Sequence, residues 1–507
     1  MSVARLPSGL LRCANHIGWI ALFWRRSLSD PGRIFAHMFE SMDPHPAVAA
    51  VDAIMSTARE ENAAGARRLA AIGELYALRA PGDDTDKQCW VIDGYAGLVV
   101  EVAAALGVSR HRAKAQLGKA IVLRERLPKV AAVYAEGVVD AVMVAMIVSR
   151  VDLIVDDEVA CRVDELLAAK ISRWGRLSLP KMEKRIDAII ASVDPPAVRG
   201  PTSATTSRYV QIRPAGPGVA TVNARLDAAT AALLDATLDG LADGVCGDDP
   251  RSREHRRAAA IDALARGNTL RCLCGRSDCA AAQEGSAVMG ARAVIHVVAS
   301  SDDTAPGYLC GYGPIPAEQV AALRDGALVR NVCAPADAAE PRYRPSAKLA
   351  EYVRCRDLTC RFPDCDQPAE GCDIDHTIAH PHGPTHPSNL KCLCRFHHLV
   401  KTFLDWKDQQ YPDGTVVWTA PTGHTYVTRP EGAHWFPILG TPTGVLPEAQ
   451  DRPHGPGRGL CMPTRARTRQ HERTTRIRAE RKANQECINQ HHERQRTAEA
   501  NDEPAPF

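Results

Sequence analysis

The chain has 507 residues, of which 45% are hydrophobic and 24% are charged, and its formal net charge is +2. This composition is ordinary for a soluble globular protein, and the length predicts two to four domains. A net charge so close to zero excludes any argument for nucleic-acid binding from overall charge, so such an argument must rest on local patches.

The 17 cysteines are thinly spread except in two clusters. In a long chain without an export signal, this pattern argues against a disulfide framework and for metal-bound thiolates in a reducing cytoplasm. The apolar run Ile17–Trp24 is far shorter than the roughly 17–25 residues that cross a bilayer. Residues 1–37 are therefore expected to be a disordered or misassigned leader, and no membrane association is predicted.

Residues 38–195 are predicted to form a helical bundle. Apolar residues recur at helical spacing near its start, at Val48, Val51, Ile54 and Met55. Further helices are expected over residues 95–106, 110–123, 128–148, 156–169 and 179–191. Their short connections are typical of a bundle.

Residues 103–120, reading AAALGVSRHRAKAQLGKA, resemble a helix-turn-helix DNA-binding unit. Gly107 would lie in the turn and Ser109 would cap the second helix, which carries Arg110 and Arg112 as candidate DNA contacts. The alternative, which we favour, is an ordinary helical hairpin with a solvated basic face, because a glycine turn is common in any bundle.

Residues 196–345 are expected to form a small α+β unit packed on the bundle. A β-hairpin is predicted from strands over 209–212 and 219–222. Residues 291–299, reading ARAVIHVVA, are apolar enough to predict a central strand. The helices expected in this unit span residues 228–242, 254–265 and 314–323.

Cys272, Cys274 and Cys279 form a compact cluster within this unit. Three thiolates this close in sequence can hold a zinc ion if a fourth ligand comes from elsewhere. The candidates for that ligand, which the sequence does not rank, are His255, His296 and Cys310. A loop with three reduced cysteines is the alternative.

The segment from Cys360 to Lys401 concentrates five cysteines and six histidines. Cys360 and Cys365 flank a tight turn, and Cys394 and His397 are spaced i, i+3 on a helix expected over 393–403. These four side chains predict a tetrahedral zinc site that fastens the helix to the entering chain. The alternative ligands in the same segment are Cys372 and Cys392.

The same segment contains a second set of candidate ligands, whose oxygen and nitrogen donors are harder than the cysteine sulfurs. Asp375 and His376 lie in a β-branched run that predicts a strand over 374–378, on which they point to opposite faces. Because neighbours on a helix differ by about 100° in direction, His397 can face the zinc while His398 faces a second site.

Asp375 and His398 are therefore predicted to bind a catalytic Mg²⁺ or Mn²⁺ ion. His376 is predicted to take a proton from water, and the reaction that such a set supports is phosphodiester hydrolysis. Asn389 is expected either to hold the His376 imidazole or to fix the neighbouring loop.

At these residues the segment resembles an HNH endonuclease domain of the ββα-metal type. Asp375-His376, Asn389 and His398 match the three signature positions, and the four predicted zinc ligands match the zinc pairs of many members. The resemblance implies a ββα-metal fold over 346–428, with His376 as general base, Asp375 and His398 as metal ligands and Asn389 as the orienting residue. A Cys-His second zinc pair departs from the commoner Cys-Cys.

The wider layout resembles the actinobacterial 13E12 repeat family, which joins a domain of unknown function, the 222-numbered one, to a C-terminal HNH domain. The stretches that carry this resemblance are CLCGRSDC, YLCGYGPIP, CRFPDCDQPAEGCDIDHT and GPTHPSNLKCLCRFHHLVKT. They lie within residues 38–427. This resemblance supplies no substrate, since the helical domain of the family is itself unexplained.

Residues 429–507 are expected to be a basic disordered tail; a helix over 473–484 is an alternative that we favour less. From 451 to 496 the chain is rich in arginine and has almost no large apolar residues, so it cannot bury enough apolar surface to fold alone. The candidate phosphate contacts are Arg473 and Arg476 in this tail and Arg395 and Lys401 in the preceding domain. A solubilising tail is the alternative.

Taken together, the sequence predicts a mainly α chain with a small α+β unit and a C-terminal zinc-containing nuclease domain. The predicted function is that of a cytoplasmic, metal-dependent DNA endonuclease, whose helical domain binds DNA or a partner. The alternative is a zinc-containing DNA-binding protein that does not cut. The oligomeric state is left open, and a homodimer is one option.

Overall fold

The structure, a computed structural model, describes residues 46–79, 85–175, 177–199, 208–282, 296–302, 304–324, 327–332, 335–444 and 461–501. The expected leader, residues 1–37, and residues 291–295 of the predicted strand lie outside these ranges. The described chain is rich in α-helix and carries four small antiparallel sheets. No helix among these residues is both long enough and apolar enough to span a membrane.

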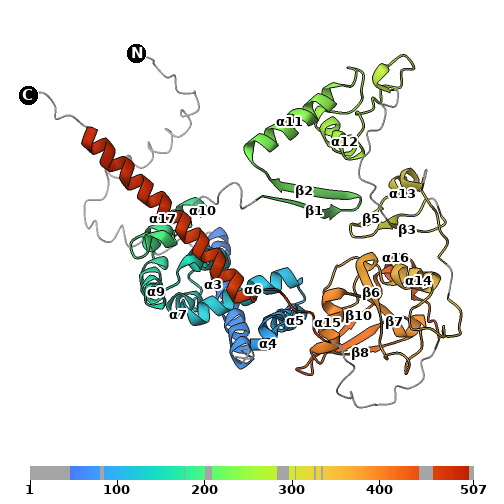
Figure 1. Cartoon of the computed structure of the whole chain (residues 1–507), viewed down its shortest axis with the longest axis horizontal. Helices are drawn as coiled ribbons and strands as arrows, with labels where there is room; N and C mark the ends of the chain where they lie inside the picture. The colour runs from blue at the N-terminus through green and yellow to red at the C-terminus, as the bar shows by residue number, and fades with distance from the viewer. Residues whose placement is uncertain are drawn as a thin grey trace, which may run out of the picture.

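The N-terminal part is a helical bundle (Figure 1). Its helices are α3 (Pro46–Leu78), α4 (Thr85–Gln88), α5 (Gly94–Leu106), α6 (Arg110–Glu125), α7 (Pro128–Ala135), α8 (Ala141–Arg150), α9 (Asp157–Ile171) and α10 (Leu179–Ala191), with 3₁₀ turns η1 (Val151–Leu153) and η2 (Pro195–Ala197). Asp93, Asp140 and Asp156 cap three of them by accepting a backbone N–H bond at 2.8, 2.7 and 3.0 Å. The expected turn forms at Gly107, whose φ is 59°, but Ser109 makes no side-chain capping bond.

One prediction for the bundle is wrong in detail. The helix expected over 128–148 is two helices, because the chain turns at Gly137 with a φ of +76°. A Cβ atom there would lie 2.3 Å from the carbonyl oxygen of Arg59, so only glycine fits this close approach. The apolar residues near the start of α3 are exposed, and burial on this helix begins only around Ala66.

Helix α5 is shared by two hydrophobic cores. Leu98, Val99 and Val102 pack into the core of the bundle. Ala96 and Val100 instead pack with the residues of the C-terminal unit. A helix that is apolar on all sides is expected to be buried on all sides, and this one joins the bundle to the C-terminal unit.

The middle unit begins with the predicted hairpin. Its elements are β1 (Tyr209–Gly216), β2 (Val219–Arg225), α11 (Ala228–Asp243), α12 (Arg253–Arg266), η3 (Ala280–Ala282), β3 (Val297–Ala299), β4 (Gly307–Leu309), β5 (Gly313–Ile315) and α13 (Ala317–Arg324). Within the described residues, β3 is a short edge strand of the β3–β4–β5 sheet, so the expectation of a central strand is wrong.

The middle unit was expected to pack on the bundle, but its β3–β4–β5 sheet contacts the C-terminal unit. The ring of Tyr308 in β4 lies 6.1 Å from that of Trp435. The β1–β2 hairpin is attached to this sheet, because the backbone N–H of Gly218 donates a hydrogen bond of 2.9 Å to the carbonyl of Pro314 in β5.

The C-terminal unit surrounds a core that contains Phe362, Trp406 and Trp418. Its elements are α14 (Ala347–Asp357), η4 (Ala369–Gly371), β6 (Cys372–His376), η5 (Pro387–Asn389), β7 (Leu390–Cys394), α15 (Arg395–Phe403), β8 (Lys407–Gln410), β9 (Val416–Thr419), β10 (Thr425–Thr428), α16 (Glu431–Trp435) and η6 (Pro437–Gly440). Strands β6 and β7 pair antiparallel, and α15 follows β7 directly (Figure 1).

A buried ion pair ties α14 to this hairpin. Arg356 and Asp357 are 1% and 0% exposed and bond to each other at 2.8 Å. Arg356 donates to the carbonyls of Pro387 and Leu390, each at 2.7 Å, and Asp357 accepts from the backbone N–H of Cys392 at 2.8 Å. All of these polar groups are paired with protein partners, as burial requires.

The tail differs from the expected disordered arm. Residues 431–440 fold as α16 and η6 against the C-terminal unit, and Arg469–Asn501 forms the long helix α17, which crosses the bundle (Figure 1). Ile477 is the buried apolar contact of this helix. Its other anchors are charged or polar, since Arg481 bonds Asp194 at 2.7 Å and Asn484 bonds the carbonyl of Val198 at 2.8 Å.

Candidate functional site

The predicted zinc ligands Cys360, Cys365, Cys394 and His397 meet at one point. Their ligand atoms all lie within 4.8 Å of one another. The Nδ1 atom of His397 is 3.6 Å from the sulfur of Cys360 and 3.4 Å from that of Cys394. Sulfurs that share one tetrahedral zinc at about 2.3 Å lie about 3.8 Å apart, so this set fits a single ion.

The alternative ligands Cys372 and Cys392 are not members of this set. The Cys372 thiol donates to the carbonyl of Pro368 at 3.3 Å, and Cys392 is fully buried among apolar residues. Hydrogen bonds from Cys360 and Cys365 lower the pKa of the Cys394 thiol, whereas burial raises the pKa of Cys360 and hydrogen bonds with Cys360 and Cys394 raise that of Cys365. Metal binding would require all three as thiolates.

The turn between Cys360 and Cys365 is held by packing and by one arginine. Phe362 stacks on the His397 ring at 4.2 Å, with 10° between the planes. Arg361 donates to the carbonyls of Arg429, Gly414 and Thr428, and its own carbonyl accepts from Trp418 Nε1 at 2.9 Å. This turn is thereby fixed to the β8–β9–β10 sheet by protein contacts.

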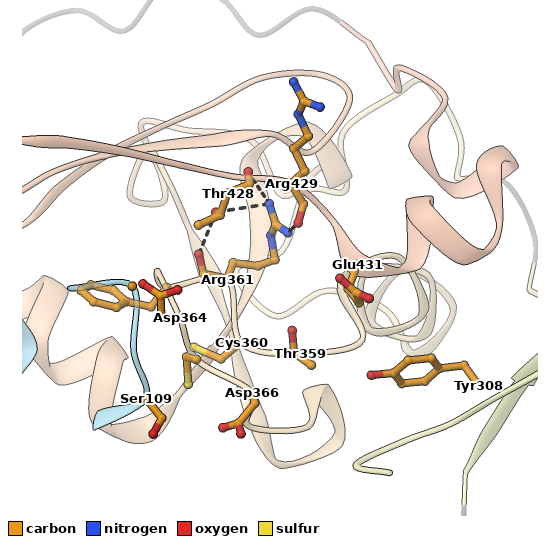
Figure 2. Close-up of a pocket in the computed structure, with 13 residues that line it drawn as sticks. Ser109, Tyr308, Thr359, Cys360, Arg361, Asp364, Asp366, Thr428, Arg429 and Glu431 are labelled. Carbon is orange, nitrogen blue, oxygen red and sulfur yellow. Dashed lines mark hydrogen bonds between the residues drawn. The ribbon is translucent and has the colours of Figure 1, made fainter. Parts of the chain in front are cut away.

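Figure 2 shows a hollow of about 480 Å³ beside this turn. Ser109, from the turn that follows α5, lies at one side, and Tyr308 of the middle unit lies at the other. Arg361 and Thr428 are bonded to each other between them. The hollow therefore marks where three parts of the chain meet around the cysteine turn.

Asp375 and His398 are brought together on one face of the β6–β7 hairpin. The Nε2 atom of His398 lies 3.4 Å from Asp375 Oδ1, and its Nδ1 atom lies 2.9 Å from Asp373 Oδ2. A carboxylate that holds the far nitrogen of a histidine fixes the ring for metal binding. The structure thus brings together the two residues that were predicted to bind a divalent ion, and it adds Asp373 as a supporting residue that the sequence did not indicate.

The other oxygen of Asp375 is bound to lysines. Lys391, which faces Asp375 across the hairpin, donates to Oδ2 at 2.9 Å, and Lys401 donates to it at 2.6 Å. Both lysines also pair with Asp408, at 2.6 and 3.1 Å. Burial alone raises the pKa of Asp375, but the two lysines outweigh it and hold that pKa well below its ordinary value.

Hydrogen bonding to Asp375 raises the pKa of His398, against the opposing effect of burial. Lys391 is completely buried; burial lowers its pKa, but Asp375 and Asp408 more than compensate, so it stays charged. Lys401 was predicted to contact nucleic acid, yet its ammonium group is already engaged by Asp375 and Asp408. A contact between Lys401 and nucleic acid therefore stays a prediction, which would require these ion pairs to open.

His376 points to the opposite face of the hairpin, as expected from strand alternation. Its Nε2 atom lies 3.0 Å from the hydroxyl of Thr385, and the ring of Tyr343 stacks on it at 5.4 Å. Burial lowers the pKa of His376 to about 4, although Asp375 acts in the opposite direction. The imidazole is therefore neutral near pH 7, which is the form that accepts a proton.

Asn389 fixes a loop and does not hold the His376 ring. Its Oδ1 atom accepts from the N–H of Ile378 at 2.8 Å, and its Nδ2 atom donates to the carbonyls of Ile378 and Pro384 at 3.0 and 2.8 Å. Of the two roles expected for Asn389, the structure selects the second. Thr385, at the end of that loop, is the group that contacts His376, so Asn389 acts on the base only through the loop.

The other candidate DNA contacts differ in what their side chains touch. The guanidinium of Arg110 stacks on the Phe396 ring at 4.0 Å, so it joins α6 to α15. Arg112 is exposed, and Arg395 is exposed with a long contact of 3.4 Å to Asp373. Arg473 and Arg476 both bond to Asp152, at 3.0 and 2.7 Å. They are therefore structural anchors of α17.

The second cysteine cluster has a fourth member. Cys272, Cys274 and Cys279 lie with Cys246, and the four sulfurs are within 4.8 Å of one another. None of the fourth ligands suggested by the sequence, His255, His296 and Cys310, belongs to this group. Cys246 was missed because it lies 26 residues before its partners, at the end of a different helix.

One family model and several relatives match this chain. Residues 56–357 match the family described as "Domain of unknown function (DUF222)". "Uncharacterized protein Rv3776" of Mycobacterium tuberculosis strain H37Rv is 45% identical over 489 residues, which cover 90% of this chain and 92% of that protein.

Two further relatives come from the same species. "Uncharacterized protein Rv2100" is 43% identical over 513 residues, again 90% of this chain and 92% of the relative. "Uncharacterized protein in est 3'region" is 40% identical over 358 residues, 64% of this chain and 99% of the relative. No solved structure matches the chain significantly.

Proposed function

Because the chain belongs to the DUF222 family, whose description names no activity, we propose a function from the site itself: a metal-dependent DNA endonuclease that hydrolyses phosphodiester bonds. The proposal includes the narrower assignment to the 13E12 repeat family with a C-terminal HNH domain. The order of β6, β7 and α15 supports it, since two paired strands followed by a helix are what that resemblance implies.

One observation carries the proposal. Asp375 and His398 present an oxygen and a nitrogen 3.4 Å apart on one face of the hairpin, and the neighbouring His376 is a buried neutral histidine on the other. A structural zinc set requires neither group. A hard cation-binding pair beside a neutral histidine is the combination that metal-assisted hydrolysis of a phosphodiester uses.

The roles of the side chains follow from their contacts. Asp375 and His398 would hold Mg²⁺ or Mn²⁺, which when bound would offset the charge that develops on the phosphate oxygens. Asp373 keeps the His398 ring in place through Nδ1. Thr385 holds one nitrogen of His376, which leaves the other free to take the proton of an attacking water.

The cysteine-rich ligand set supports the same assignment, because a metal ion bound there would stabilise the fold of the nuclease unit. Cys360, Cys365, Cys394 and His397 would hold Zn²⁺ and fasten α15 to the turn before β6. The described cysteines are free, in keeping with the proposal of a cytoplasmic protein.

A non-catalytic DNA-binding protein is the second candidate, and the lysines favour it. Lys391 and Lys401 already neutralise one oxygen of Asp375 without any metal ion. If these contacts persist when Mg²⁺ is offered, the carboxylate binds the ion weakly and the site does not cut.

The test is nicking of supercoiled plasmid DNA by the full chain with Mg²⁺ or Mn²⁺. We expect His376→Ala to lose about 10²–10⁴-fold in rate, as removal of a general base does. His424→Ala is the matched control, because the His424 side chain is exposed and hydrogen-bonds to Thr422, two residues earlier, at 3.0 Å. A parent protein that binds DNA but never nicks it would exclude the nuclease and leave the second candidate.

A further inference from the structure

The cluster formed by Cys246, Cys272, Cys274 and Cys279 lies far from the hairpin of the proposed nuclease. Cys246 follows α11, and the other three lie in the loop after α12 (Figure 1). The sulfurs of Cys246 and Cys272 are 3.4 Å apart, and all four lie within 4.8 Å of one another. Two separate stretches of chain thus deliver four soft donors to one point.

We propose that these four cysteines bind one Zn²⁺ ion, which holds together the α11–α12 unit of residues 228–282. This site is independent of the proposed nuclease activity and of the Cys360 set. Its ligands are four thiolates, with Cys246 as the ligand that closes the tetrahedron.

The spacing of the sulfurs selects a single ion. One tetrahedral zinc with bonds of about 2.3 Å places its sulfurs about 3.8 Å apart, which agrees with the observed range. An iron–sulfur cluster would hold its cysteines around a wider inorganic core. A disulfide brings two sulfurs to about 2.05 Å, and it would leave two further thiols at the same point without a function.

The backbone around the cluster is built to hold the loop in place. Asp249 accepts from the N–H of Leu273, between two of the cysteines, at 2.9 Å and is held in turn by Arg251 at 2.8 Å. The N–H of Cys272 donates to Ala281 at 2.7 Å. Gly275, directly after Cys274, has a φ of +73°, which lets the loop turn back toward Cys279.

Two arginines near the cluster offset part of the two negative charges that a zinc tetrathiolate would carry, although both are also paired with aspartates. Arg276 and Arg251 both lie close enough to interact electrostatically with the cysteines. Arg276 is positioned by bonds to Asp278 at 2.9 Å and Asp248 at 3.1 Å. Positive side chains held near the sulfurs favour thiolates over thiols.

The α11–α12 unit also has too small a core to be held together by apolar burial alone. Among the described residues its buried apolar cluster is small: Val245, Ala263, Leu270 and Cys272 are buried, and partly buried side chains such as Leu241 and Ala259 pack against them. A core of this size does not offset the conformational entropy of ordering two helices and a loop, and metal binding is one way in which small units compensate. The ion would therefore contribute folding free energy to this unit.

The test is the zinc content of the full chain, purified under reducing conditions and measured by mass spectrometry. We expect two zinc ions per chain in the parent and one in Cys246→Ser. The matched control is Cys461→Ser, because Cys461 is exposed and lies outside both sets, so this variant should keep both ions. Cys274→Ser should behave like Cys246→Ser.

A second measurement keeps the outcome independent of folding defects. Cobalt added to the metal-free chain should give sulfur-to-cobalt absorption that falls by more than half in Cys246→Ser, since four of the seven thiolates in the two sets belong to this site. Unchanged zinc in Cys246→Ser, iron in place of zinc, or a mass shift on reduction that reveals a disulfide would overturn the proposal. Absence of plasmid nicking would not, because the site does not rest on that activity.

Discussion

The two cysteine sets use similar ligands in opposite surroundings. The Cys360 set lies against a large core with Phe362 and Trp418, and three of its four ligands are buried. The Cys246 set lies beside a smaller core, in which Val245, Ala263 and Leu270 are buried and side chains such as Leu241 are partly buried, and three of its four cysteines are half-exposed. The first site adds to a fold held by apolar burial, whereas the second supplies much of what holds its unit together.

Charge shows the same contrast. In the C-terminal unit the ion pair of Arg356 and Asp357 is fully buried. In the α11–α12 unit Arg251 pairs with the buried Asp249, but other arginines pair with carboxylates at the surface, as Arg257 does with Asp235 and Asp239. Surface pairs contribute little individually and are screened by salt, so this unit depends on its metal ligands more than on its ion pairs.

The largest expected effect separates the two sets by function. Cys360→Ser should abolish plasmid nicking, because the ion joins α15, which carries His398, to the rest of the unit. Cys246→Ser should leave nicking within about twofold of the parent, since distant sites act independently. Nicking rates of the two variants, measured beside Cys461→Ser, give the comparison. Equal loss in both variants would show that the sites are coupled.

The next effect concerns the buried and exposed ion pairs. Arg356→Leu should lower the free energy of unfolding by about 3–5 kcal/mol, because it leaves Asp357 charged and buried. Arg257→Leu, at a half-exposed pair, should cost less than about 1 kcal/mol. Urea denaturation of both variants measures the difference. Similar losses would contradict the contrast between core-held and surface-held regions.

A third test compares how readily each set gives up its ion. A chelator should remove zinc from the half-exposed Cys246 set at least about tenfold faster than from the buried Cys360 set, since local opening is easier where few apolar contacts must break. Zinc release followed with a coloured indicator should show two phases in the parent. The fast phase should be missing in Cys246→Ser; its persistence there would reverse the order.

The smallest effect is expected for α17, which charge holds to the bundle. Burial raises the pKa of Asp152, but hydrogen bonds from Arg476 and Arg473 outweigh it and leave that pKa below its ordinary value. The stabilisation is therefore complete above the unfolded value of about 3.9 and is lost as pH falls below it toward the folded pKa. Solvent screening limits the effect to about 1 kcal/mol or less.

Amide hydrogen exchange across α17 between pH 3 and 6 measures this effect, after correction for intrinsic exchange rates. Protection should fall at the acid end in the parent. In Asp152→Asn it should be weaker throughout and change less with pH. A parent whose protection does not depend on pH would mean that Ile477 and Arg481, and not Asp152, hold the helix.

Sequence reasoning found the ligands that are close together in the chain. Cys360 with Cys365 and Cys394 with His397 are recognisable pairs, and the adjacent histidines predicted two sites. Cys246 was not recognisable, because helix α12 separates it from its partners and only folding brings it to them. Asp373 and Lys391 were missed for a related reason, since they act through the cross-strand register and the helix packed on it.

The tail shows where composition misleads. Residues 469–501 lack an apolar face, so a rule based on hydrophobic burial predicts disorder. The helix instead finds its partners in Asp152, Asp194 and backbone carbonyls near η2, which belong to a region about 300 residues earlier. The residues of α17 that make these contacts recur at helical spacing, but they are polar and so lie outside a pattern based on apolar residues.

Helix α5 has a consequence for how this gene can be divided. Because Ala96 and Val100 belong to the core of the C-terminal unit, we expect that unit not to fold when it is separated from α5. A fragment that starts near residue 346 would lack the α5 side chains that complete its core. A fragment that stops there would expose the apolar face of α5 to solvent. Exchange of nuclease units between relatives should therefore succeed only when residues 92–104 are transplanted together with the C-terminal unit.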